Sequence, residues 1–143
     1  MRGLNPLTIR RTFAGIAAVL LLLVAVVVWT VVIGPVSTDT TPGASPEASV
    51  IAFYVHIAAA FGTSFVLVAS VTLLGQRRWP VFAAAVALLL GLTCIDAANE
   101  FAKRGPDLEQ ATRALRLGAG AEALAACLAI ATAFGPLWHR TRQ

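Results

Sequence analysis

The sequence predicts an all-α integral membrane protein folded as a four-helix bundle. Of its 143 residues, 58% are hydrophobic and only 13% are charged, whereas soluble domains carry about 25% charged residues. The mean hydropathy is +0.80. The apolar residues also gather in four blocks of roughly 20 to 25 residues, and each block is long enough to cross the bilayer core as one helix. The predicted spans cover about 13–33, 50–74, 79–98 and 117–138. Their connections are short, so residues 1–143 form one membrane domain.

The first span follows three arginines, as a signal peptide would. Its apolar core is about 21 residues long, against 7 to 15 for the apolar part of a signal peptide, so we interpret it as a retained helix. Gly34-Pro35 is expected to end this helix. The segment 34–49 is rich in Ser, Thr, Pro and Gly, which predicts an irregular external loop.

The later spans are bounded by similar signals. Gly75 should end the second span, and Pro80 suits the first turn of the third, where its missing N–H is not needed. Beyond Ala98 the chain turns polar, and Asp107 is expected to cap the helix that carries the fourth span. Small residues are frequent in spans three and four and favour close packing in lipid; they include Ala83, Ala84, Ala85, Gly91, Gly118, Gly120, Ala125 and Ala126.

The net charge of +4 and the pI near 10 reflect topology. The loop 34–49 contains no Lys or Arg, and the basic residues on that side of the bundle are accompanied by acidic ones. The positive-inside rule then places both termini in the cytoplasm and predicts a multi-pass protein of the inner (cytoplasmic) membrane, with no nucleic-acid partner. The arginines that set this orientation are Arg2, Arg10, Arg11, Arg77, Arg78, Arg140 and Arg142.

The two cysteines, Cys94 and Cys127, lie in different spans and form no Cys-x-x-Cys motif. We interpret both as small core residues. The quinone-linked thiol oxidases with four helices need a reactive cysteine pair near the surface, so this sequence does not fit that class.

Three ionisable residues lie within the predicted spans: His56, Asp96 and Glu122. Helical rise places them in one layer, on the order of 5 to 10 Å below the outer interface. Ionisable groups inside a membrane are rare and usually face the bundle interior, where they mark a site. We therefore expect these three side chains to converge.

Each of the three also has a purely structural interpretation. His56 can bond a backbone carbonyl or Asp96, and the two carboxylates can pair with basic residues near the outer surface. A metal site of His, Asp and Glu is a further alternative, since these ligands suit zinc or iron, although no HExxH motif is present. The basic candidates are Lys103 and Arg104 for Asp96, and Arg113 and Arg116 for Glu122.

The stretch from the end of the first span through the second resembles the haem-handling membrane proteins of cytochrome c maturation, the CcmC/CcsA group. The matching features are Gly34-Pro35, Gly43 and the segment 51–60, which reads Ile-Ala-Phe-Tyr-Val-His-Ile-Ala-Ala-Ala. The resemblance covers roughly residues 20–95 and implies that His56 is an axial haem ligand near the outer leaflet. The family's proline after the histidine is Ala58 here, and its tryptophan-rich segment and later spans are missing.

The resulting functional hypothesis is a non-enzymatic haem-handling protein that acts with another membrane subunit. His56 would ligate the iron, and Arg113 and Arg116 would pair with the haem propionates. The alternative is an accessory subunit of a larger respiratory or photosynthetic complex with no cofactor of its own. A third possibility is proton or ion conduction through Asp96 and Glu122.

Overall fold

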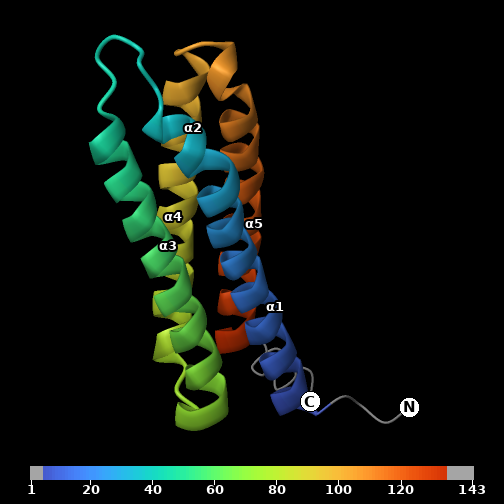
Figure 1. Ribbon diagram of the computed structural model, residues 1–143. Helices are drawn as coiled ribbons and strands as arrows, with labels where there is room; N and C mark the ends of the chain where they lie inside the picture. The colour runs from blue at the N-terminus through green and yellow to red at the C-terminus, as the bar shows by residue number, and fades with distance from the viewer. Residues whose placement is uncertain (1–4, 135–143) are drawn as a thin grey trace.

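The computed structural model describes residues 5–134, and within them the chain is helical with no strand. Four helical segments are long and apolar enough to cross a membrane: Pro6–Ser37, Pro46–Leu74, Arg78–Ala102 and Pro106–Phe134. They run up and down alternately as an elongated bundle (Figure 1). Over the described residues this confirms the predicted all-α bundle, with four helical segments that are long and apolar enough to span a membrane.

The first segment begins seven residues before the apolar block and continues past its predicted end. Helix α1 spans Pro6–Val27, with the Asn5 side chain accepting a hydrogen bond from the Leu7 N–H at 3.0 Å. A π-helical stretch, Val28–Val32, leads into α2, Ile33–Ser37. Proline donates no backbone hydrogen bond, and π-helical turns change the hydrogen-bond register of a helix. The helix therefore continues through Gly34-Pro35 to Ser37, and the predicted helix end at Gly34-Pro35 is wrong.

The loop is shorter than predicted. It occupies 38–45, because α3 starts at Pro46, before the apolar block begins, and runs to Ala69. Proline at the first helical position and Glu47 in the first turn are favourable at a helix start whatever their hydropathy. A second π-helical stretch, Ser70–Leu74, ends at Gly75, whose φ of 60° makes the turn into the next helix.

The third and fourth segments also extend beyond their apolar blocks. Helix α4 spans Arg78–Ala102, and a 3₁₀ turn, Pro106–Leu108, leads into α5, Glu109–Phe134. Asp107 lies within the 3₁₀ turn, which has no side-chain cap, so its predicted role as the helix cap is wrong. The last part of the predicted fourth span, 135–138, falls outside the described residues.

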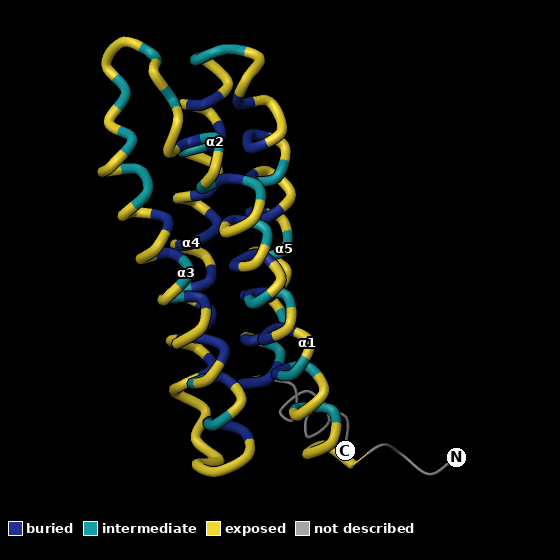
Figure 2. Tube along the Cα trace, viewed as in Figure 1, coloured by how far each residue is buried: buried dark blue, intermediate teal, exposed yellow. Residues whose placement is uncertain are grey.

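Helix α5 packs along both α4 and α1, and α3 lies against α1 and α4. Figure 2 shows the buried positions lining the inside of the bundle. On α4 they are mostly small and recur every three or four residues, which keeps one narrow face toward the neighbouring helices. A side-chain carbon at Gly91 would lie only 3.4 Å from the Ala119 carbonyl oxygen of α5. These α4 positions are Ala84, Ala87, Gly91, Cys94 and Ala98.

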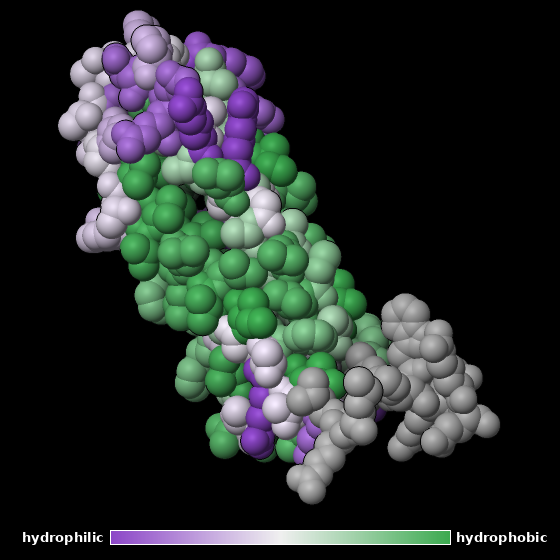
Figure 3. Space-filling model, turned by 90° about the vertical axis from the view of Figure 1, so that its right-hand side faces the viewer, coloured by the Kyte–Doolittle hydropathy of each residue, from purple (hydrophilic) through white to green (hydrophobic). Residues whose placement is uncertain are grey.

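Large apolar side chains are exposed around the middle of the bundle, among them Leu23, Phe65, Leu89 and Leu117. Figure 3 shows this apolar belt between two more polar ends. On the loop side of the belt, the Trp29 and Tyr54 rings meet edge to face at 5.4 Å between centroids, as expected for aromatic residues at a membrane interface. The belt is what a lipid bilayer would cover.

Candidate functional site

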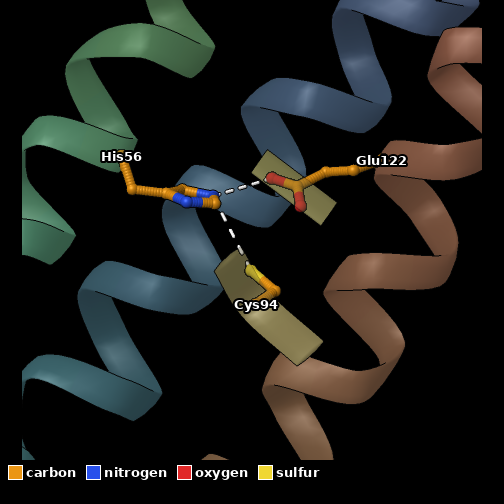
Figure 4. A group of neighbouring side chains, drawn as sticks. All are labelled: His56, Cys94 and Glu122. Atoms are coloured by element: carbon orange, nitrogen blue, oxygen red, sulfur yellow. Dashed lines mark hydrogen bonds and ion pairs between the residues drawn. The ribbon is translucent and has the colours of Figure 1, made fainter. Parts of the chain in front are cut away.

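The centre of the site is a contact between His56 of α3 and Glu122 of α5. The His56 Nε2 lies 2.7 Å from the Glu122 Oε1, and the two side chains are 6% and 0% exposed (Figure 4). His56 lies about three turns inside the start of α3, so the contact is well below the polar loop end. The structure thus brings these two predicted residues together inside the bundle.

Cys94 of α4, which the sequence suggested was only a small core residue, completes a cluster with these two side chains. Its Sγ lies 3.8 Å from the His56 Nε2, and one donor atom from each of the three residues falls within 4.8 Å of the others. Figure 4 shows the three side chains converging from three different helices. The spacing of small buried residues on α4 was the available signal, because Cys94 occupies the position between Gly91 and Ala98 on that face.

The second carboxylate oxygen of Glu122 is fully buried and has no hydrogen-bond partner among residues 5–134. Unpartnered buried oxygens cost free energy and are rare in folded proteins. The second ring nitrogen of His56 also has a polar neighbour. Its Nδ1 lies 3.4 Å from the Thr93 hydroxyl, which donates to the Leu90 carbonyl at 2.7 Å. The cluster therefore has one oxygen left over for a ligand.

Asp96 does not join this cluster. It is exposed on α4 and lines a cavity of about 380 Å³ between α3 and α4, whose wall also includes His56. The expectation that all three ionisable residues converge in the interior is therefore wrong for Asp96. The structural alternative that paired His56 with Asp96 is also wrong, since His56 contacts Glu122.

The predicted pairing of the intramembrane carboxylates with outer basic residues is not what the structure shows. Lys103 pairs with Glu100 at 2.8 Å, and Arg113 pairs with Glu109 of its own helix. Arg113 and Arg116 line a separate surface pocket beside Gly105 and do not face the His56 cavity. Arg113 and Arg116 therefore do not face a ligand bound at His56.

Arg104 has a role in holding the loop. Its guanidinium lies 3.0 Å from the Asp39 carboxylate and 5.3 Å from the centre of the Phe101 ring. Hydrogen bonds from Thr41, together with Arg104, lower the pKa of Asp39 below its ordinary value. This stabilisation is present above the ordinary pKa and is lost as the pH falls through the lowered one. The loop 38–45 is thus tied to the end of α4 at neutral pH.

Cys127 was interpreted as a core residue, and that interpretation is wrong because its side chain is exposed on α5. Only Cys94 of the pair is buried. Compared with known proteins, the chain matches no family model, no curated protein and no solved structure. The geometry of the cluster is therefore the basis on which a function can be proposed.

Proposed function

We propose that this four-span membrane protein binds a divalent transition-metal ion within its bundle, with His56, Cys94 and Glu122 as ligands. The observation that carries the proposal is the convergence of one nitrogen, one sulfur and one oxygen donor from three helices. This donor set suits zinc, which takes imidazole, thiolate and carboxylate together. The unpartnered Glu122 oxygen supports it further.

The distances agree with such a site after a small adjustment. In a tetrahedral zinc site, ligand nitrogen and sulfur atoms are about 3.6 Å apart, and nitrogen and oxygen about 3.4 Å apart. The His56 Nε2 and the Cys94 Sγ are 3.8 Å apart, so they need almost no movement. The 2.7 Å separation from Glu122 is a hydrogen-bond distance, and the carboxylate would move outward as the ion replaces the hydrogen bond.

The second candidate function is haem handling. His56 would be one axial ligand, and a partner protein would supply the rest of the haem site. The largely apolar cavity beside His56 favours it, because a porphyrin edge needs such a space. Two features count against it. The His56 Nε2 is engaged by Glu122, and the cation nearest the cavity is Arg104, which already holds Asp39, whereas Arg113 and Arg116 lie elsewhere.

One set of preparations distinguishes these functions. Protein stripped with a chelator is titrated with Zn²⁺, and with Co²⁺ as a coloured substitute that reveals a thiolate ligand by its charge-transfer absorption. Cys94→Ser is compared with Cys127→Ser, the same change at an exposed position. We expect one Zn²⁺ per chain in the wild type and in Cys127→Ser. We expect Cys94→Ser to lose the cobalt–thiolate band and to bind zinc at least about 100-fold more weakly, since even outer-shell changes cost 10- to 100-fold.

Equal zinc affinity in the two cysteine variants would refute the metal site. The same preparations are examined for a Soret band. A band in wild type that disappears in His56→Ala would favour the haem function instead. Neither zinc nor haem in the wild type would favour the accessory subunit of a larger membrane complex.

The orientation in the membrane is part of the proposal. We place the loop 38–45 outside the cell's inner membrane and both termini in the cytoplasm, because Arg10, Arg11, Arg77 and Arg78 lie at the end opposite this loop. In a Cys127→Ser background, a cysteine introduced at Ser45 should react with an impermeant thiol reagent added from outside. Reaction only from the cytoplasmic side would reverse the orientation.

A further inference from the structure

The cavity between α3 and α4 reaches only one of the three proposed ligands. His56 forms part of its wall, whereas Cys94 and Glu122 do not. The lining extends from residues near the loop end, Glu100 and Arg104, to Leu90 in the bundle. The imidazole therefore separates this cavity from the buried sulfur and carboxylate, with its Nδ1 near Thr93 and its Nε2 near Glu122.

Two of the three charged residues that line the cavity have ion-pair partners within residues 5–134, and the third does not. Glu100 is paired with Lys103, and Arg104 with Asp39. Asp96 makes no hydrogen bond or ion pair with any residue in the part of the chain that the structure describes. It lies one helical turn from Thr93, the residue that contacts His56. Asp96 is thus the carboxylate of the cavity wall that has no ion-pair partner among the described residues, and it lies one turn from the residue that contacts the imidazole.

We propose that this cavity is the route by which a hydrated divalent cation reaches the His56–Cys94–Glu122 cluster from the loop end, and that Asp96 holds the ion before His56 receives it. The inference rests on the metal site proposed above. The volume of about 380 Å³ accommodates an ion with its first shell of waters, since each water occupies roughly 30 Å³. The buried, unpartnered Glu122 oxygen is the final acceptor at the inner end. In this proposal the His56 side chain must turn away from Glu122 for the ion to pass from the cavity to the buried sulfur and carboxylate.

The test separates the rate of loading from the affinity. Metal-free protein in lipid nanodiscs is mixed rapidly with Co²⁺, and the growth of the cobalt–thiolate absorption is followed for the wild type and three variants. Asp96→Asn removes the docking charge, and Ala97→Phe fills the cavity wall. Asp107→Asn is the matched control, because Asp107 lies at the same end of the bundle and does not line the cavity.

We expect Asp96→Asn and Ala97→Phe to load at least about tenfold more slowly, the lower end of the effect that a charged cleft has on association rates. Asp107→Asn should load at the wild-type rate, and all four proteins should reach one Co²⁺ per chain. Full occupancy with unchanged rates in both cavity variants would overturn the route while leaving the metal site intact. No cobalt–thiolate band in the wild type would instead overturn the metal site itself. A variant that never reaches full occupancy is judged misfolded, and the other cavity variant then decides.

Discussion

Glu122→Leu is expected to lower the free energy of unfolding by about 1 to 3 kcal/mol, because it leaves the buried His56 imidazole without its hydrogen-bond partner. Glu122 is fully buried and His56 nearly so. His56→Leu should cost a similar amount by stranding the carboxylate. The double variant should recover most of the loss, since replacing both partners of a buried hydrogen bond by apolar side chains of similar size can be nearly neutral in stability.

The measurement is denaturant unfolding in detergent micelles with a chelator present, so that no metal contributes. Glu109→Leu on the same helix is the control. Its pair with Arg113 is largely exposed, and such pairs contribute about 0 to 1 kcal/mol. If the double variant is as unstable as the sum of the two single variants, the His56–Glu122 contact does not hold α3 to α5, and the expectation fails.

Ala87→Leu is expected to destabilise the bundle by about 1 to 3 kcal/mol, because a longer side chain does not fit a packed core. Ala87 is 1% exposed and belongs to the core cluster that α4 shares with Ala125 and Ala129 of α5. Helices in lipid associate through such close contacts between small residues. The same change at Ala85, two residues away and exposed, should alter stability by less than about 0.5 kcal/mol. Equal losses at the two positions would show that the narrow face of α4 is not a tight contact.

The sequence predicted the number and approximate place of the helices because hydropathy in long blocks is a strong signal. It did not predict where the helices end. Pro46 starts α3 inside what hydropathy suggested was a loop, and α2 continues past Gly34-Pro35. Helix ends are set by backbone hydrogen bonding and by the preferences of individual residues, which a count of apolar residues does not measure.

The sequence predicted how deep the site residues lie in the bundle, but not the direction in which each side chain points around its helix axis. Equal depth placed His56 and Glu122 in one layer, and the structure brings them together. It also placed Asp96 in that layer, but each residue turns the helix by about 100°. Asp96 therefore lies roughly 200° around α4 from Cys94, whose side chain faces the cluster. The periodicity of the small residues on α4 carries the rotational information that depth lacks.

The position of α5 has a consequence for the order in which the bundle assembles during synthesis. α5 packs along both α1 and α4, although about 80 residues lie between the end of α1 and the start of α5. The small apolar face of α1 therefore has no long-range partner in α5 until the last described helix has been inserted. Helices that insert first and associate later remain free in the bilayer in the meantime. The Arg10 side chain, which donates to the Thr132 carbonyl at 2.9 Å, joins α1 to α5 only once α5 has been inserted, so the contact between these two helices forms after those of α1 with α3.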